Sequence, residues 1–153
     1  MQEIEWNQMI PEFDVINLEE TLHFYIDLIG FELAYERKED KFAFIQLEKI
    51  QIMLQELSNE NKWETGKLEY PFGRGVNFQL DVKCIAEIYN RLKNNNYDIF
   101  VDMEEHWYRK DNVMLGCKEF LVKDPNGFLL RFSEDLGEKV IQKKLFKLNK
   151  LTS

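Results

Sequence analysis

The sequence predicts an α+β protein in which two βαβββ modules form a curled eight-stranded half-barrel around a central cleft. Two observations predict this fold class. Apolar residues alternate as in a strand, recur at helical spacing and alternate again, and the whole order returns after a polar stretch. The two halves also align with each other, which indicates an internal duplication. The alignment pairs Val15 with Val82, Leu18 with Ile85, Leu22 with Tyr89 and Tyr25 with Leu92.

The first module is predicted over residues 8–57. A strand over residues 10–16 leads into a helix, which Asn17 caps with Glu20 three positions further on. Gly30 ends that helix, because glycine readily adopts the left-handed conformation found at helix ends. Three strands follow, over residues 31–40, 41–49 and 50–57.

The second module is predicted over residues 73–137, after a polar linker over residues 58–72. Its elements are a strand over residues 75–82, a helix over 83–96 and strands over 97–104, 117–124 and 128–135. It is longer than the first module because of a predicted loop over roughly residues 104–116. The basic tail over residues 138–153 either forms an amphipathic helix or frays into solvent.

Composition bounds what the chain can bury and bind. With 153 residues, 44% of them apolar and 14% aromatic, the chain can bury one sizeable core. Its twelve Phe, six Tyr and three Trp either add to that core or line a ligand groove. The net charge is -8, and the tail carries five Lys and one Glu, so the remaining body is more acidic still. An acidic body argues against a nucleic-acid partner, and it either attracts cationic ligands or simply keeps the protein soluble.

The sequence also predicts a location. Cys84 and Cys117 show no metal-site spacing, and the N-terminus lacks a basic-then-apolar signal pattern. No stretch approaches the roughly 18 apolar residues that indicate a membrane helix. We therefore expect free thiols, no membrane partner and a cytoplasmic protein.

Two short motifs and the duplication resemble one known superfamily. The first helix contains FYIDLIGF, residues 24–31, and the last two strands are joined through KDPNGFLLRF, residues 123–132. In this order, they resemble the vicinal oxygen chelate superfamily, which includes glyoxalase I, extradiol dioxygenases, fosfomycin-resistance enzymes and bleomycin-resistance proteins. The likeness runs from about Ile10 to Gly137. It implies a protein that is dimeric and holds a small molecule in its cleft.

Enzymes of this superfamily hold a divalent metal with strand side chains, and this sequence lacks such a set. Carried over, the metal-binding places fall on Ile10, Met53, Asn77 and Arg131. Divalent metals of this kind bind imidazole, carboxylate or thiolate, and Arg131 would put a permanent positive charge in the cation's place. His23 and His106 lie away from these strands in the expected fold. The resemblance therefore implies no metal, no cofactor and no catalytic residue, and it favours the bleomycin-resistance proteins.

Side chains alternate along strands, so every second residue is expected to face the cleft. The expected ligand contacts are Glu12, Asp14, Met53, Gln55, Asn77, Gln79, Glu119 and Arg131, with Ile10 and Leu121 beside them and Trp107 and Tyr108 on the adjacent loop. Arg131 either pairs with Glu119 or Glu12, or grips a ligand carboxylate or phosphate at two points. Trp107 and Tyr108 either stack on flat rings of a ligand or close a subunit interface.

The predicted function is non-catalytic binding of a small-molecule ligand. The ligand class is a cationic glycopeptide antibiotic of the bleomycin type, sequestered in an acidic, aromatic cleft of a homodimer. The alternative is a metal-dependent glyoxalase-like lyase or isomerase, or a dioxygenase, with an atypical ligand set. Its oxygen donors would be Glu12, Gln55, Asp81 and Glu119.

Overall fold

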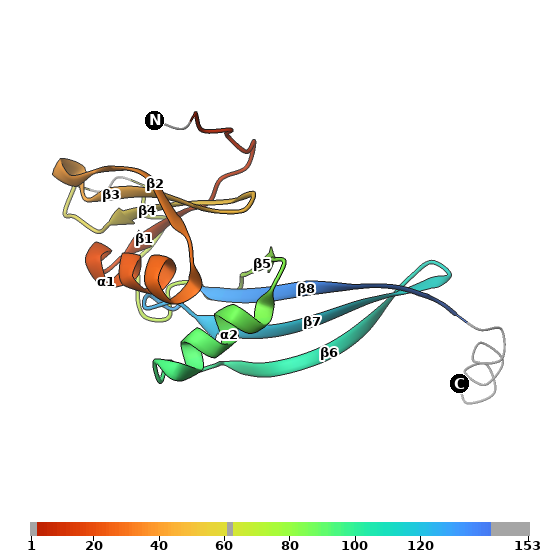
Figure 1. Ribbon diagram of the computed structural model, residues 1–153. Helices are drawn as coiled ribbons and strands as arrows, with labels where there is room; N and C mark the ends of the chain where they lie inside the picture. The colour runs from red at the N-terminus through yellow and green to blue at the C-terminus, as the bar shows by residue number, and fades with distance from the viewer. Residues whose placement is uncertain (1–2, 61–62, 142–153) are drawn as a thin grey trace.

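The computed structural model describes residues 3–60 and 63–141, which form two four-stranded sheets (Figure 1). In the first sheet the strands lie in the order β1-β4-β3-β2, with β1 parallel to β4 and the other neighbours antiparallel. Its strands are β1 (Glu12–Val15), β2 (Glu32–Arg37), β3 (Phe42–Leu47) and β4 (Ile50–Glu56).

The second sheet repeats this arrangement. Its strands lie in the order β5-β8-β7-β6, again with one parallel pair at the edge. They are β5 (Asn77–Asp81), β6 (Val101–Lys110), β7 (Val113–Lys123) and β8 (Leu129–Val140). The predicted two-module α+β fold is therefore confirmed, and its eight strands form two open sheets.

Each sheet has helical structure packed on one face. These elements are α1 (Leu18–Leu22), which continues into the π-helix η1 (His23–Ile29), and α2 (Ile85–Asn94), with a short 3-10 turn η2 (Lys38–Asp40) after β2. Asn17 Oδ1 accepts a hydrogen bond from the backbone N–H of Glu20, with an N–O distance of 2.9 Å. Gly30 follows η1 with a left-handed φ of 110°. The predicted start and end of the first helical segment are thus both confirmed.

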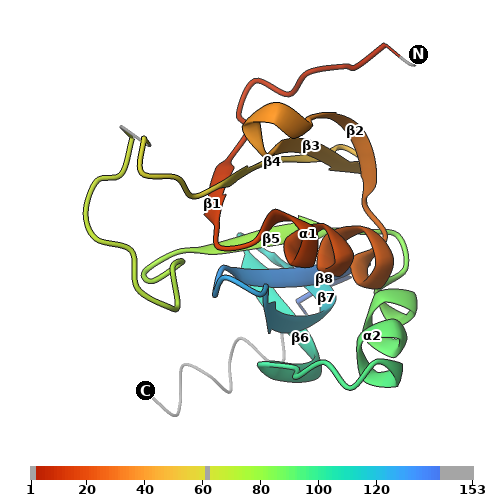
Figure 2. The same ribbon diagram turned by 90° about the vertical axis from the view of Figure 1, so that its left-hand side faces the viewer.

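The two modules share one hydrophobic core. Phe13 of β1 stacks on Phe128 with 4.2 Å between ring centroids, and its centroid lies 4.9 Å from that of Phe78 in β5. Figure 2 shows α1 and η1 between the two sheets. Removal of these facing apolar surfaces from water is the dominant force holding the modules together.

Polar contacts reinforce this joint at the turn after β7. Asp124 and Asn126 are each 1% exposed. The Tyr25 hydroxyl donates to Asp124 Oδ2 at 2.8 Å, and Asn126 Oδ1 accepts from the backbone N–H of Ile16 at 2.8 Å. Burial raises the pKa of the Asp124 carboxyl, and burial beside that carboxyl raises the pKa of the Tyr25 phenol well above its usual value. The DPNG turn is therefore a buried joint between the modules.

Arg91 of α2 closes the end of η1 from the other module. Its Nε donates to the carbonyl of Leu28 at 2.9 Å and its Nη2 to the carbonyl of Ile29 at 2.6 Å. The last carbonyls of a helix have no partner within the helix, so these bonds satisfy groups that would otherwise need water. A Cβ at Gly30 would lie 3.0 Å from Arg91 Nη2, so the approach of the two modules also favours glycine there.

One predicted element of the second module is wrong. The loop expected over residues 104–116 is a long hairpin, in which β6 runs to Lys110 and β7 begins at Val113. Its polar composition suggested a loop, but cross-strand pairing satisfies the backbone whatever the side chains. β8 continues to Val140, so the first residues assigned to the tail belong to the sheet, and residues 142–153 lie outside the described part. In the described ranges no helix is long and apolar enough to cross a membrane.

Candidate functional site

The face of the second sheet that points away from α2 is hollowed. Along β8, Leu130 and Phe132 are buried in the core, and Arg131 between them lies on the opposite face. The same alternation brings Gln79 of β5 and Glu119 of β7 to this face. We call this depression, of about 960 Å³, the module-two hollow. The residues that matter most for its chemistry are Gln79, Tyr108, Cys117, Glu119, Arg131 and Ser133.

Glu119 is the centre of the polar contacts in the module-two hollow. Its side chain is only 8% exposed, and its Oε1 accepts a hydrogen bond from the Tyr108 hydroxyl at 2.7 Å. His106 Nε2 lies 3.7 Å from the same oxygen. Its other oxygen, Oε2, lies 3.8 Å from Cys117 Sγ and 4.0 Å from Arg131 Nη1. One buried carboxylate therefore holds a phenol, a thiol and a guanidinium around it.

That carboxylate alters the acidity of two neighbours. The hydrogen bond to Glu119 is the main reason that the pKa of the Tyr108 phenol is raised. Burial, followed by the charge of Glu119, raises the pKa of the Cys117 thiol. Both groups consequently remain protonated at neutral pH, and Cys117 is a poor nucleophile because the thiolate is the reactive form.

Arg131 forms its ion pair with Glu119, one of the two acidic partners that the sequence suggested. The other, Glu12, lines a different depression, on the first sheet. The Arg131 side chain is 32% exposed, yet its Nε is buried and has no hydrogen-bond partner among the described residues. The 4.0 Å separation from Glu119 is also too long for a hydrogen bond. Charge attraction and packing therefore hold the guanidinium, while its Nε–H keeps its capacity to donate.

The module-two hollow has an acidic lining. Six carboxylates and three basic side chains line it, so negative charge prevails. The carboxylates belong to Glu48, Asp81, Glu119, Glu134, Asp135 and Glu138. Glu134 accepts from the backbone N–H of Ile85 at 3.1 Å, and Asp135 from that of Gly137 at 2.9 Å. These bonds orient the two carboxylates without neutralising them, and a hollow lined by one sign of charge concentrates ions of the opposite sign.

The first sheet carries a second, smaller depression, which we call the module-one hollow. Its volume is about 630 Å³, and Glu12, Asp14, Gln55 and Trp63 are among the residues that line it. Burial, and then the charge of Asp14, raise the pKa of the Glu12 carboxyl, while Arg37 opposes this shift. Six carboxylates and two basic side chains line this hollow, so it also favours cations.

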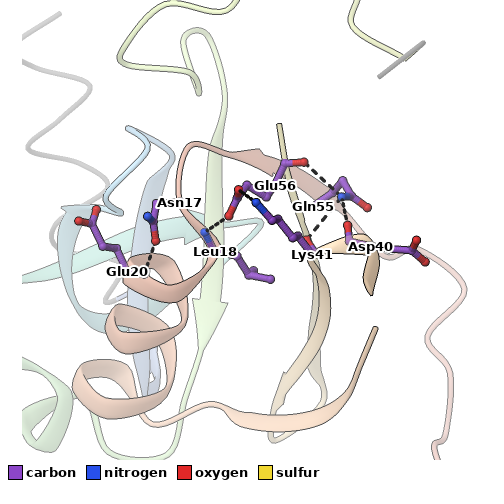
Figure 3. Close-up of polar contacts among 7 residues, drawn as sticks. All are labelled: Asn17, Leu18, Glu20, Asp40, Lys41, Gln55 and Glu56. Carbon is purple, nitrogen blue, oxygen red and sulfur yellow. Dashed lines mark hydrogen bonds and ion pairs between the residues drawn. The ribbon is translucent and has the colours of Figure 1, made fainter. Parts of the chain in front are cut away.

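Polar contacts fix one edge of the module-one hollow (Figure 3). The Gln55 side-chain amide donates to the backbone carbonyl of Asp40 at 2.8 Å. Glu56 Oε2 accepts from the backbone N–H of Leu18 at 2.9 Å, and its Oε1 lies 3.1 Å from Lys41 Nζ. The bond from Leu18 is the main reason that the pKa of Glu56 is lowered. These contacts tie β4 to η2 and to the start of α1, which is a structural role.

The structure divides the expected ligand contacts between the two hollows. Gln79, Tyr108, Glu119 and Arg131 meet in the module-two hollow, whereas Glu12, Asp14 and Gln55 line the module-one hollow. Met53 and Asn77 share sheet faces with these residues but line neither hollow. Alternation within each strand was predicted correctly, but the expected residues do not meet around one cleft in a single chain.

Trp107 and Tyr108 are neighbours on β6 and not on a loop, so their side chains point to opposite faces of the sheet. Trp107 packs across Gly116, and Lys139 Nζ lies 3.7 Å from its ring centroid. Tyr108, which is 49% exposed, lines the module-two hollow. The two rings therefore cannot form a common stacking surface.

Among the residues of the module-two hollow that were not expected as ligand contacts are Cys117, Ser133 and Asp135. The signal that could have found them is strand alternation, because Ser133 and Asp135 follow Arg131 at every second position. Cys117 precedes Glu119 in the same way, and Ser133 is the cross-strand partner of Glu119.

The residues present do not fit a divalent metal. The places carried over from the resemblance lie on different modules: Ile10 and Met53 on the first, Asn77 and Arg131 on the second. Within the two described ranges, no group of three or more His, Cys, Asp or Glu side chains is placed to hold a metal ion. The oxygen donors of the enzyme alternative are divided as well, with Glu12 and Gln55 in one hollow and Asp81 and Glu119 in the other.

Comparisons with known proteins agree with this architecture. The bleomycin resistance protein of Geobacillus stearothermophilus is 25% identical to this chain over 138 residues, covering 84% of this chain and 97% of that protein. Integron cassette protein VCH_CASS1 of V. cholerae superposes with a TM-score of 0.63 at 13% identity, over 88% of this chain and 98% of its own. A glyoxalase/bleomycin resistance protein/dioxygenase of Alicyclobacillus acidocaldarius gives 0.59 at 19% identity, over 86% and 92%. The two structures share the fold of this chain.

A family model covers most of the chain. It matches residues 13–132, a range that includes strands of both sheets and the helices packed on them. The matched range also contains both motifs, FYIDLIGF and KDPNGFLLRF, on which the resemblance was based. The chain therefore belongs to the Glyoxalase/Bleomycin resistance protein/Dioxygenase superfamily.

Proposed function

We propose that this protein binds a small molecule in the module-two hollow and sequesters it without transforming it. The ligand class is a cationic glycopeptide antibiotic of the bleomycin type. The observation that carries the proposal is the guanidinium of Arg131, which lies 4.0 Å from the buried carboxylate of Glu119. A permanent cation at the place where enzymes of the superfamily carry a metal-binding carboxylate is compatible with holding a ligand and incompatible with seating a metal ion.

The charge and shape of the hollow support a cationic ligand. Carboxylates outnumber basic side chains by six to three in a depression of about 960 Å³, a volume within the range of ligand pockets. The half-exposed ring of Tyr108 adds a flat surface for stacking on a heteroaromatic ring of the ligand.

The relatives support the same ligand class. The curated proteins that are 25% identical to this chain, from Geobacillus stearothermophilus and Staphylococcus aureus, are named bleomycin resistance proteins. We propose a cytoplasmic homodimer with no nucleic-acid partner. Sedimentation of the purified protein tests the dimer, and a monomer at micromolar concentration would contradict that part of the proposal.

Calorimetric titration with metal-free and with copper-bound bleomycin tests the ligand. Removing two carboxylates of the hollow, in the double variant Asp81→Asn with Asp135→Asn, is expected to weaken binding severalfold. Asp27→Asn is the matched control, since Asp27 lies on the exposed side of η1 and its side chain is 62% exposed. No heat and no thermal shift at high excess of either form would remove bleomycin as the ligand. Elemental analysis and a glyoxalase assay test the alternative. If the protein holds a stoichiometric metal that is essential for turnover of a glyoxalase substrate, it is an enzyme and the binding proposal is wrong.

A further inference from the structure

Arg131 brings a guanidinium into the module-two hollow, and its Nε–H donor has no partner among the described residues. A guanidinium carries five N–H donors in a fixed plane. Its buried Nε has no partner among the described residues, and Nη1 lies 4.0 Å from Glu119. Buried polar groups in native proteins are nearly always hydrogen-bonded, so a group that is not requires an explanation.

The neighbouring side chains do not satisfy this guanidinium. Glu119, its ion-pair partner, accepts the Tyr108 hydroxyl at 2.7 Å with one oxygen. Gln79 is the cross-strand partner of Arg131. Its side-chain amide donates along β5 to Asp81 Oδ1 at 2.9 Å. The guanidinium therefore has charge compensation from Glu119, but within the described part of the chain no acceptor lies within hydrogen-bond distance of its Nε.

The other end of the same face carries the opposite charge. Asp81 of β5 is the cross-strand partner of Ser133, and Ser133 is two residues from Arg131 along β8. Asp135 is four residues from Arg131 on the same strand. At roughly 3.3 Å per residue, the backbone of Ser133, which Asp81 faces, lies about 7 Å from that of Arg131 along β8, and the backbone of Asp135 lies about 13 Å from it. Both Asp81 and Asp135 are exposed and line the hollow. Lys83 and Lys110 also line the hollow and lessen its negative charge without cancelling it.

We propose that the ligand of the module-two hollow has two unlike ends. A group with paired oxygen acceptors, such as a carboxylate, binds Arg131 at two points, and a cationic group about 7–13 Å away lies beside Asp81 and Asp135. A ligand with only a positive charge would be repelled by the guanidinium, and a ligand with only a negative charge would be repelled by the carboxylates. Only a molecule that carries both charges can make favourable contacts at both ends of the hollow. This inference rests on the proposed function, because it takes the hollow to be the ligand site, and it adds the chemistry that the ligand must have.

Three probes of similar length separate the two ends: ε-aminocaproate carries both, n-hexylamine only the cation and hexanoate only the carboxylate. In ¹⁵N-labelled full-length protein, ε-aminocaproate is expected to shift the Arg131 Nε–H resonance and to bind at least about tenfold more tightly than either single-ended probe, a difference of about 1.4 kcal/mol. Arg131→Lys and Arg131→Gln should each reduce its affinity to that of n-hexylamine, because lysine keeps the charge but loses the planar pair of donors.

Arg109→Gln is the matched control, since Arg109 is exposed, lies next to Tyr108 on β6 and points to the opposite face. Thermal midpoints of all variants are compared, because Arg131→Gln leaves Glu119 without its cation, whereas Arg131→Lys retains one. Equal affinity for n-hexylamine and ε-aminocaproate would overturn the proposal. The proposal would also be overturned if ε-aminocaproate shifted backbone amide resonances of the hollow but left the Arg131 Nε–H resonance in place, and bound the Arg131 variants as tightly as the unaltered protein. The proposed function fails in a different way, if neither bleomycin nor any probe shifts those amides.

Discussion

Replacing Tyr25 with Phe removes a single hydroxyl from the joint between the modules. That hydroxyl donates to Asp124 Oδ2 at 2.8 Å, and the two residues are 0% and 1% exposed. Asp124 Oδ1 keeps two donors, the backbone N–H groups of Asn126 at 2.8 Å and Phe128 at 2.9 Å. Because a hydrogen bond to a charged group contributes about 1.5–3 kcal/mol, the free energy of unfolding should fall by about that amount at neutral pH.

The loss should depend on pH in a defined direction. Burial raises the pKa of Asp124 in the folded protein above its unfolded value, so this group stabilises the fold less as pH rises through the folded pKa. The bond from Tyr25 lowers that pKa and offsets part of the effect. Tyr25→Phe removes this offset. Its cost is therefore full above the folded pKa and shrinks as the pH falls below it, where the carboxyl is protonated in both proteins.

Urea unfolding at neutral pH and at about pH 4, close to the ordinary range of aspartate, measures both effects. Tyr97→Phe is the matched control, because the Tyr97 hydroxyl donates at 2.6 Å to the uncharged backbone carbonyl of Lys123. It should cost only about 0.5–1.5 kcal/mol, by the same amount at each pH. Equal losses for the two variants, or a Tyr25→Phe loss that grows in acid, would refute the role assigned to the buried carboxylate.

Three further predictions concern packing and charge. Gly127→Ala places a Cβ 2.4 Å from Pro71 Cα at a φ of 88°, and it should cost about 2 kcal/mol or more. The control Gly66→Ala should be nearly neutral, because nothing lies within 4 Å of its added Cβ. Similar shifts of the calorimetric midpoint in the two variants would contradict the prediction. Trp6→Ala removes a ring 4.8 Å from the fully buried Phe44 and should cost about 1–2 kcal/mol in urea unfolding, whereas no loss would show that this cover is dispensable. Bleomycin should bind more weakly as salt rises from about 0.05 to about 0.5 M, and a salt-independent Kd would count against electrostatic attraction to the hollow.

The modules themselves could be predicted from the sequence because their signals are local. Asn17 and Gly30 mark the ends of a helical segment through chemistry that involves only neighbouring residues. Alternation likewise separated partly buried Phe78 and buried Leu80 from the exposed Gln79 between them. Such patterns can be recognised in a single sequence because a capped helix or a half-buried strand depends little on the rest of the chain.

The long β6–β7 hairpin could not be predicted in the same way. Its outer part alternates poorly, since few of its side chains contribute to the core. Gly116, the last residue of the predicted loop, lies within β7, where a Cβ would come within 2.5 Å of the Trp107 ring. The reason for that glycine is a cross-strand contact, and a contact between distant residues leaves no local pattern.

The division of the candidate site into two hollows also depends on contacts between distant residues. Strand alternation orients side chains within one sheet but does not determine how a second sheet faces the first. That arrangement is set by pairs such as Phe13 with Phe128 and Ile16 with Asn126. Each pair joins residues that are more than 100 positions apart, so no pattern within one module indicates the pairing.

The joint between the modules is made by side chains and helix ends, so an unbroken backbone is not what keeps the two halves together. The stacking of Phe13 on Phe128 and the bonds from Arg91 to the end of η1 all remain if the peptide chain is severed at Gly66. The two fragments should then copurify as a non-covalent pair. Either fragment expressed alone would expose its apolar residues at the joint, such as Phe13 or Phe128, to water. It should therefore aggregate until the other fragment is added.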